Sequence, residues 1–356
     1  MINVTRTYLP PIDEFKEYLD KIWNSGWVTN QGPFVSELEN RLIDFLGVNN
    51  LHLVSNGTIA IQFAIKALEL EGEIITTPYS YVATTTSIIW ENCNPVFCDI
   101  ESNSFNLDPD NIENLITENT SAILATHVYG LPCDVDKIKS IADKHNLKVI
   151  YDGAHCFGVK LNGESIFNHG DISTVSFHAT KLFHTIEGGA VITADKNLSD
   201  KVYLFRAFGH LDDDYLSIGI NGRTSELNAA MGLCNLKHVN DFINERKSVN
   251  MHYRELLKEC PLVFPDIPDE VEYNYSYFPV LFENENAMLK AKHTLEKNHI
   301  CPRRYFFPSL NELPYIKGNS CPVSENKSRR VLCLPVYNMI QEDVIKKISG
   351  IISACL

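Results

Sequence analysis

Short apolar runs fill the first two-thirds of the chain, and polar residues, Gly or Pro separate them. The runs predict strands over residues 51–54, 74–77, 96–98, 122–125, 149–151, 174–177 and 190–193. Between them, apolar residues at helical spacing predict helices over 58–68, 84–90, 109–116, 135–145 and 197–208. Strands that alternate with helices indicate βαβ units and a mainly parallel sheet. Near-continuous apolar strands fit a sheet that helices cover on both faces.

The pattern changes after Asn-Gly-Arg at 221–223. A long helix, with room for one break, is expected from 225 to about 260. The elements expected after it are a strand over 275–281, a helix over 287–297, a loop over 302–308 and a closing helix over 341–354. We therefore expect two domains. Residues 1–235 would form a large α/β domain with an N-terminal arm, and 236–356 a smaller α+β domain.

Composition and charge narrow the class of protein. The net charge is −14, and no run of five basic residues occurs, which argues against nucleic acid or an anionic membrane as partner. No apolar run is long enough to span a bilayer, and the first ten residues lack the core of a signal peptide. We therefore expect a cytoplasmic protein. The ten cysteines are irregularly spaced without a C-x-x-C pair, so free thiols are expected and no metal site.

A turn of small residues, Ser-Asn-Gly-Thr at 55–58, follows an apolar strand and opens a helix. Free N–H groups and the helix dipole at such a position favour an anion, and Gly57 allows close backbone approach. A plain helix cap, with Ser55 or Asn56 as N-cap, explains the same residues equally well. The turn alone leaves both explanations open.

Asp152 ends the apolar strand at 149–151, and ligands of parallel sheets bind beyond the carboxyl ends of strands. A carboxylate at that place can bind a pyridinium N–H and keep the ring charged. A helix cap or a loop salt bridge accounts for Asp152 alone just as well. His155 can stack on such a ring or hydrogen-bond to it, and a purely structural histidine is the alternative.

Lys181 follows the next strand, and two glycines at 188–189 come soon after it. Ser176 lies five residues before the lysine and places a hydroxyl within reach of a phosphate. A lone lysine is usually a surface charge. Here, however, the chain supplies an anion-binding turn, a strand-end acid and an amine in that order. These are the parts that pyridoxal phosphate needs: a helix N-terminus for the phosphate, a carboxylate for the ring nitrogen and an amine for the Schiff base.

Several segments carry a resemblance to a known family. They are 25–33, 55–58, 78–84, 127–130, 152–155, 176–181, 187–189, 219–226 and 303–305. Through them nearly the whole chain resembles the DegT/DnrJ/StrS sugar aminotransferases, which are fold-type-I pyridoxal phosphate enzymes. The resemblance implies a mainly parallel, mixed central sheet with helices on both faces and a smaller α+β C-terminal domain. The run Ser-Phe-His-Ala-Thr-Lys at 176–181 is its most specific part. Gly153 departs from the alanine of many members.

The resemblance also implies roles at the cofactor. Lys181 would bind the cofactor covalently and Asp152 would pair with its ring nitrogen, so both are expected to be catalytic. Gly57, Thr58 and Ser176 would hold the phosphate.

Five further positions match functional positions of the family. Tyr81 would stack on the cofactor and His155 would lie near its 3-hydroxyl. Asn221 would reach the phosphate of the neighbouring subunit's cofactor, which implies a homodimer with shared active sites. Arg223 and Tyr305 would contact the substrate.

The activity implied is the transfer of the amino group of L-glutamate to a nucleotide-linked keto sugar. The form Phe-His-Ala-Thr-Lys with a following Glu-Gly-Gly is similar to enzymes that act at C4 of 4-keto-6-deoxy sugars. We therefore expect amination of dTDP-4-keto-6-deoxy-D-glucose, for a deoxyamino sugar of O-antigen or lipopolysaccharide. A C3 enzyme of the family, which more often carries a Tyr-Pro-Gly-Lys run, or one that uses a UDP sugar, is the nearest alternative.

More distant classes fit less well. Sugar dehydratases among the relatives have histidine in place of the lysine, so Lys181 argues against them. An aldolase or decarboxylase could use the same lysine and acid, but the motifs around Asn221 and Tyr305 favour a sugar enzyme. A non-enzymatic regulator would need a nucleic-acid-binding face, which the charge opposes.

Overall fold

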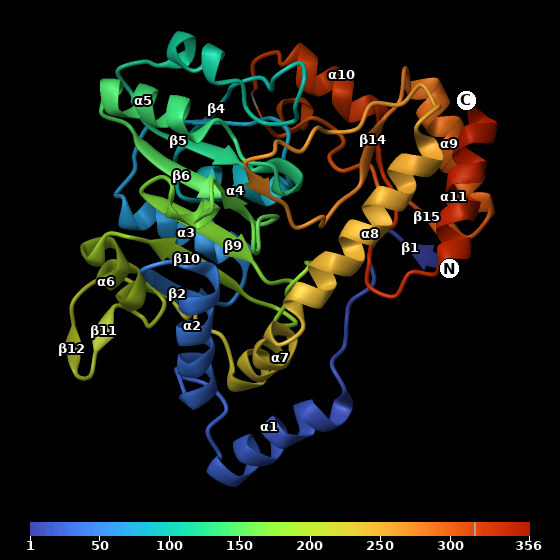
Figure 1. Ribbon diagram of the computed structural model, residues 1–356. Coiled ribbons are helices and arrows are strands. Elements are labelled where there is room, and N and C mark those ends of the chain that lie inside the picture. The colour runs from blue at the N-terminus through green and yellow to red at the C-terminus, as the bar shows by residue number, and fades with distance from the viewer. Residues whose placement is uncertain (317) are drawn as a thin grey trace.

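The computed structural model describes residues 1–316 and 318–356. Its centre is a seven-stranded sheet (Figure 1). In spatial order its strands are β2 (Asn50–Val54), β10 (Gly189–Thr193), β9 (Ile172–Ser176), β6 (Lys148–Asp152), β5 (Thr120–Thr126), β3 (Glu73–Thr76) and β4 (Asn94–Phe97). Strand β10 runs antiparallel to both of its neighbours, and the remaining neighbouring pairs are parallel. The expected mainly parallel, mixed sheet is therefore confirmed.

Helices cover both faces of this sheet. The helices of the first part of the chain are α1 (Ile12–Ser25), α2 (Pro33–Leu46), α3 (Gly57–Ala67), α4 (Val82–Trp90), α5 (Val135–His145), α6 (Lys196–Phe205) and α7 (Glu226–Leu236). In β6, Val149 and Tyr151 pack in the same apolar core as α2, α5 and α7. Ile150 between them packs in the core formed with α3. The alternation of a strand thus divides its side chains between two cores, which explains the nearly unbroken apolar runs.

The remaining chain builds a smaller α+β part. Its elements are α8 (Val239–Leu257), β13 (Val271–Glu272), β14 (Pro279–Leu281), α9 (Glu285–Lys297), β15 (Ile300–Cys301), α10 (Pro322–Arg330), β16 (Val331–Cys333) and α11 (Glu342–Cys355). Strands β14 and β16 pair antiparallel, and α8, α9 and α11 close one core over them. Strand β1 (Ile2–Asn3) pairs in parallel with β15, so the N-terminus lies against this part (Figure 1).

Two short hairpins and several 3-10 turns lie outside the central sheet. The hairpin β7 (Lys160–Leu161) and β8 (Glu164–Ser165) pairs with β13, and β11 (His210–Leu211) pairs with β12 (Asp214–Tyr215). In the described residues, 3-10 turns lie at Pro109–Asn111, Glu113–Leu115, Val128–Gly130, Ile166–Asn168 and Leu310–Glu312. Within the described ranges, no helix is both long and apolar enough to cross a membrane.

Two predicted elements differ from the structure. The helix over 109–116 is wrong, because the segment forms two 3-10 turns and Ile116 is already extended. The strand over 275–281 shrinks to β14, since Tyr275 adopts a φ of 54° that a strand does not accommodate. The helix from 225 to about 260 is broken once, between α7 and α8.

The division at residues 235 and 236 is a proposal. It falls at the last turn of α7, which ends at Leu236. The first turn of α8, with Val239 and Phe242, packs in the core of the central sheet. Later positions of α8, such as Val249 and Tyr253, pack in the core of the smaller part. One helix therefore joins the two cores.

Candidate active site

Asp152 and Ser176 lie at one edge of the central sheet. Asp152 is the last residue of β6, Ser176 is the last residue of β9, and the two strands are parallel neighbours. Their carboxyl ends therefore meet at this edge, where ligands of parallel sheets bind. Lys181 follows in the loop between β9 and β10, and a small pocket at this edge is lined by His155, Ser176 and Lys181 among others.

The Asp152 carboxyl is only 6% exposed. Its Oδ2 accepts a 2.7 Å hydrogen bond from the Thr84 hydroxyl, and its Oδ1 accepts a 3.0 Å bond from the N–H of Ala154. Burial raises the pKa of Asp152, while these two donors and the charge of Lys181 lower it. No helix begins directly after Asp152, since the next element is β7, so the alternative that Asp152 caps a helix is wrong.

The half-buried Lys181 side chain ends beside an aromatic hydroxyl. Its Nζ lies 3.3 Å from the hydroxyl of Tyr277. Burial lowers the pKa of the Lys181 amine, and the carboxylate of Asp152 opposes that effect. A lowered pKa increases the share of the neutral amine, which is the nucleophilic and basic form. Tyr305 and Tyr81 also lie near this amine.

His155 is buried next to the same pocket. Its Nδ1 accepts a 3.1 Å hydrogen bond from the N–H of Tyr129, and its ring stacks on Phe306 at 5.8 Å. Burial, aided by the charge of Lys181, holds its pKa well below the usual value, so the ring is neutral. An accepting Nδ1 leaves the proton on the other ring nitrogen. His155 therefore makes a structural hydrogen bond while it lines the site.

The turn before α3 is both a helix cap and a crowded backbone junction. The side chain of Asn56 accepts a 2.9 Å hydrogen bond from the N–H of Ile59, so the cap explanation is right for Asn56. A Cβ on Gly57 would lie 3.0 Å from Cβ of Ser176. A Cβ on Gly189 would lie 2.7 Å from the backbone carbon of Asn56. Side chains are thus excluded where the first N–H groups of α3 meet the Ser176 hydroxyl, which fits a phosphate group.

Tyr81 and Tyr305 face the amine from two other segments. Tyr81 is the residue before α4, and its side chain is 61% exposed. The ring of Tyr305 meets that of Tyr277 edge-on at 6.0 Å, and its carbonyl accepts a 2.9 Å hydrogen bond from the hydroxyl of Tyr79. Both therefore lie where a ligand bound at Lys181 would meet an aromatic surface.

Asn221 and Arg223 do not line the pocket of Lys181. Arg223 Nε is 3.4 Å from Oδ1 of the exposed Asn221, and the Arg223 guanidinium lies over the Phe208 ring at 5.4 Å. The carbonyl of Gly222 accepts a 2.8 Å hydrogen bond from the N–H of Ser55. This segment is therefore fixed beside the turn before α3, at the surface of the subunit.

Two residues of the site give no clear signal in the sequence. Thr84 was part of a family segment without a role, although it lies three residues after Tyr81 and so on the same side of α4. Tyr277 gave no signal, because its contact with Lys181 spans 96 residues. Both were identified only by the tertiary structure.

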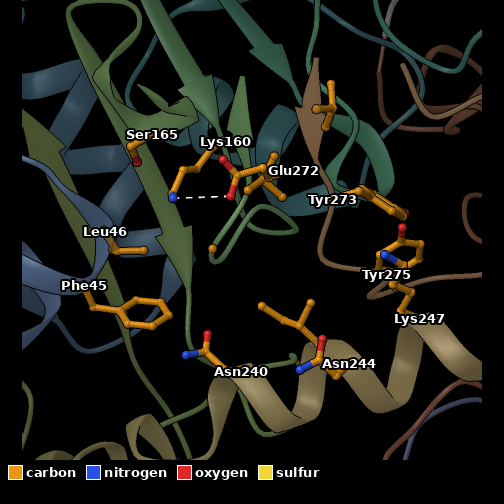
Figure 2. Close-up of a pocket in the computed structure, with 14 residues that line it drawn as sticks. Phe45, Leu46, Lys160, Ser165, Asn240, Asn244, Lys247, Glu272, Tyr273 and Tyr275 are labelled. Atoms are coloured by element: carbon orange, nitrogen blue, oxygen red, sulfur yellow. Dashed lines mark ion pairs between the residues drawn. The ribbon is translucent and has the colours of Figure 1, made fainter. Parts of the chain in front are cut away.

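A second pocket, of about 400 Å³, lies between the end of α2, the β7–β8 hairpin, β13 and α8 (Figure 2). Lys160 and Glu272 form a 3.3 Å ion pair in its wall, and Lys247 lies 5.9 Å from the centre of the Tyr275 ring. Lys181 does not line this pocket. In the part of the chain that the structure describes, no three His, Cys, Asp or Glu side chains are grouped to hold a metal ion.

Comparison with known proteins extends the resemblance. The model of the DegT/DnrJ/EryC1/StrS aminotransferase family matches residues 11–353. The dTDP-4-amino-4,6-dideoxy-D-glucose transaminase of Escherichia coli is 41% identical over 367 residues, covering 99% of this chain and 98% of that protein. Its namesake from Shigella dysenteriae is 42% identical over 355 residues, covering 98% and 97%. The crystal structure of DesI in the presence of its TDP-sugar product superposes with a TM-score of 0.95, at 31% identity, covering 99% of this chain and 92% of that one.

These similarities agree with the geometry of the site. Aminotransferases of the matched family use pyridoxal phosphate. A buried strand-end carboxylate, a desolvated amine and a backbone turn closed to side chains fit the three parts of that cofactor. The family match spans most of the chain, and the fold of its solved neighbour is the same. This chain therefore belongs to the DegT/DnrJ/EryC1/StrS aminotransferase family.

Proposed function

We propose that this aminotransferase moves the amino group of L-glutamate to C4 of dTDP-4-keto-6-deoxy-D-glucose, in the synthesis of a deoxyamino sugar for a surface polysaccharide. The observation that carries the chemistry is the Lys181 amine, which lines a small pocket at the sheet edge where the buried Asp152 ends β6. The identity of 41% and 42% to two dTDP-4-amino-4,6-dideoxy-D-glucose transaminases supports the choice of sugar. The likeness to DesI, studied with a TDP-sugar product, supports the nucleotide.

When bound, pyridoxal phosphate supplies an electron sink for the carbon that gains or loses the amino group. In our proposal the Asp152 carboxylate holds a proton on the ring nitrogen. The first N–H groups of α3, at Gly57 and Thr58, and the Ser176 hydroxyl hold the phosphate. Tyr81 would stack on the ring and His155 would orient its 3-hydroxyl.

Lys181 would then move the proton. Its amine would take a proton from the α-carbon of glutamate and return it on the cofactor side, and it would reverse this transfer on the sugar. The lowered pKa of Lys181 keeps part of the amine neutral, as a base requires. General-base catalysis of this kind is worth ~10²–10⁴-fold in rate. Arg223 and Tyr305 are proposed to contact the sugar nucleotide.

A homodimer with shared sites is part of the proposal. An apolar groove beside the turn before α3 is lined by Phe63, Trp90 and Ile218 among others. Trp90 is 77% exposed and Ile218 93% exposed, which is costly for a monomer in water. A second subunit on this surface would bury both side chains and would bring the neighbouring Asn221 toward the partner's phosphate site.

The test is a product spectrum. The protein is incubated with pyridoxal phosphate, L-glutamate and dTDP-4-keto-6-deoxy-D-glucose, and the sugar ring couplings are read by NMR. A product with the amine at C4 would establish both the reaction and its position. The couplings of H4 to H3 and H5 would give the configuration of the amine.

Other outcomes distinguish the alternatives. If glutamate converts the bound cofactor to its amine form but this sugar gives no product, the enzyme is an aminotransferase with another acceptor. The assay then moves to 3-keto sugars and to UDP-linked sugars. If other amino acids convert the cofactor and glutamate does not, the proposed donor is wrong.

A further inference from the structure

Tyr277 is the closest hydroxyl to the reactive amine. It lies in the segment between β13 and β14, 96 residues after Lys181 in sequence. Its hydroxyl is 3.3 Å from Lys181 Nζ, and Nζ is 6.0 Å from the centre of its ring. The ring also packs 4.7 Å from that of His155 and 6.0 Å from that of Tyr305. Tyr277 thus joins the lysine to two other residues at the site.

The backbone around Tyr277 is firmly tied to the segment after β6. The Asn274 side chain donates hydrogen bonds of 2.8 Å to the carbonyl of His155 and 3.0 Å to that of Phe157. Its Oδ1 accepts a 3.1 Å bond from the N–H of Ser276. The carbonyl of Ser276 also accepts a 3.3 Å bond from the buried Arg246. The backbone next to Tyr277 is therefore held by buried hydrogen bonds, and its ring packs against His155 and Tyr305.

We propose that Tyr277 is a positioning residue that holds the Lys181 amine in place for proton transfer. The proposal rests on the aminotransferase function above, because it assigns Tyr277 a part in that reaction. A neutral phenol can accept a hydrogen bond from an ammonium group and donate one to a neutral amine. The hydroxyl can thus stay bonded to Lys181 in both protonation states that a proton shuttle passes through.

The phenol is suited to this part by its surroundings. Burial raises the pKa of Tyr277, so its hydroxyl keeps its proton at neutral pH. The other titratable groups that face Lys181 are Asp152, His155, Cys156, Tyr81 and Tyr305. Among the described residues, Tyr277 is the one whose side chain forms a hydrogen bond with the lysine Nζ.

The test compares Tyr277→Phe with Tyr275→Phe. The second change removes a hydroxyl two residues away, in the wall of the separate pocket, where the ring faces Lys247 (Figure 2). The first readout needs no turnover: the rate at which the apoprotein captures pyridoxal phosphate is followed by absorbance across pH. Its midpoint reports the pKa of the Lys181 amine, because only the neutral amine reacts. The second readout is kcat and KM for both substrates.

Loss of the phenol removes a hydrogen bond that stabilises the ammonium form. We expect the capture midpoint of Tyr277→Phe to fall by about one pH unit, as the loss of one hydrogen bond to a charged group implies. We expect kcat to fall ~10-fold with KM changed less than about twofold, since the amine is less well held. Tyr275→Phe should match the wild type in both readouts.

Three results would overturn the inference. If Tyr277→Phe changes neither the midpoint nor kcat, the Tyr277 hydroxyl has no part in the reaction. A lower kcat with an unchanged midpoint means that the change acts through general structure. If the wild type captures no pyridoxal phosphate at all, the proposed function fails and the inference fails with it. Capture by the wild type with no shift in the variant overturns the inference alone.

Discussion

The Thr84 hydroxyl donates a 2.7 Å hydrogen bond to Oδ2 of Asp152 and so joins the first turn of α4 to the end of β6. Both residues are buried, where one donor has a large effect on a carboxylate. The bond lowers the pKa of Asp152 against the burial that raises it. Thr84 therefore helps to keep the acid ionised, which is the form that can pair with a protonated ring nitrogen.

Replacement of Thr84 by valine tests this relationship. Thr84→Val keeps the shape and removes the donor, so the pKa of Asp152 should rise by about one unit. Since the ionised form is required, the acidic limb of the kcat–pH profile should move to higher pH by a similar amount. Activity above that limb should change little.

Thr85→Val is the matched control. Thr85 is also fully buried, but in the described part of the chain its hydroxyl has no hydrogen-bond partner. The variant should leave the pH profile unchanged and raise the free energy of unfolding by about 1 kcal/mol, because an unsatisfied group is removed. Equal pH shifts in the two variants would disprove the assignment to Thr84.

Lys181→Ala should abolish turnover and the visible absorbance of lysine-bound cofactor. Without cofactor, however, the Lys181→Ala protein should be at least as stable as the wild type. A base whose pKa is lowered in the folded state binds fewer protons there than when unfolded, so it destabilises the fold below its ordinary pKa. Thermal unfolding of apo Lys181→Ala at pH 7 should therefore occur at an equal or higher temperature than that of the apo wild type.

Lys160→Ala serves as the control for Lys181→Ala. Lys160 forms a solvent-exposed ion pair with Glu272, which is worth at most about 1 kcal/mol. Its loss should leave turnover and cofactor absorbance intact. Full activity of Lys181→Ala would refute the active-site assignment.

Much of the fold could be predicted because the strands pack on both sides. In β6, Val149 and Ile150 enter different cores, so consecutive positions are apolar and the run is visible in the sequence. By contrast, β1 was not expected, because its pairing of Ile2 with Ile300 joins opposite ends of the chain. The 3-10 turns at Pro109–Asn111 and Glu113–Leu115 imitate a helix in spacing but are too short to continue as one.

The site was predictable where its parts follow one another along strands. Asp152 and Ser176 lie at the ends of neighbouring parallel strands, and each follows an apolar run that is visible in the sequence. The contacts of Thr84 with Asp152 and of Tyr277 with Lys181 span 68 and 96 residues. Such contacts depend on how whole elements pack, which no local pattern encodes.

The proposed sharing of sites across a dimer predicts that two inactive subunits can complement each other. If Asn221 holds the partner's phosphate as proposed, Asn221→Ala should weaken cofactor retention. A mixed dimer of Lys181→Ala and Asn221→Ala subunits would hold one intact site, made of Lys181 from one subunit and Asn221 from the other. Random mixing should restore about a quarter of the wild-type sites. The assay is turnover at a cofactor concentration that leaves the Asn221→Ala protein mostly empty.

Asn240→Ala is the control for the mixing experiment. Asn240 is exposed on α8 and lines the separate pocket of Figure 2. When Asn240→Ala is mixed with Lys181→Ala, the activity should equal that of the Asn240→Ala subunits alone, without any gain from mixed dimers. If Lys181→Ala and Asn221→Ala subunits form mixed dimers without any gain in activity, Asn221 acts within its own subunit or has no such part.

The backbone around Gly189 leaves no room for a side chain. A Cβ there would lie 2.7 Å from the carbon of Asn56 and 2.8 Å from the N of Gly57, and backbone atoms cannot rotate away. Gly189→Ala should therefore push the turn before α3 off β10. We expect a loss of about 1–3 kcal/mol in the free energy of unfolding and weaker binding of pyridoxal phosphate. Urea unfolding and cofactor titration measure the two effects.

Gly350→Ala provides the opposite case within the same chain. Gly350 lies inside α11, and a Cβ there would meet no atom within 4 Å. Alanine should therefore stabilise the helix by roughly 0.5–1 kcal/mol through its better helix propensity, with cofactor binding unchanged. The pair separates two reasons for a glycine, because of the two only Gly189 lies where a Cβ would meet the turn before α3. Unchanged cofactor affinity in Gly189→Ala would mean that the turn before α3 does not hold the phosphate.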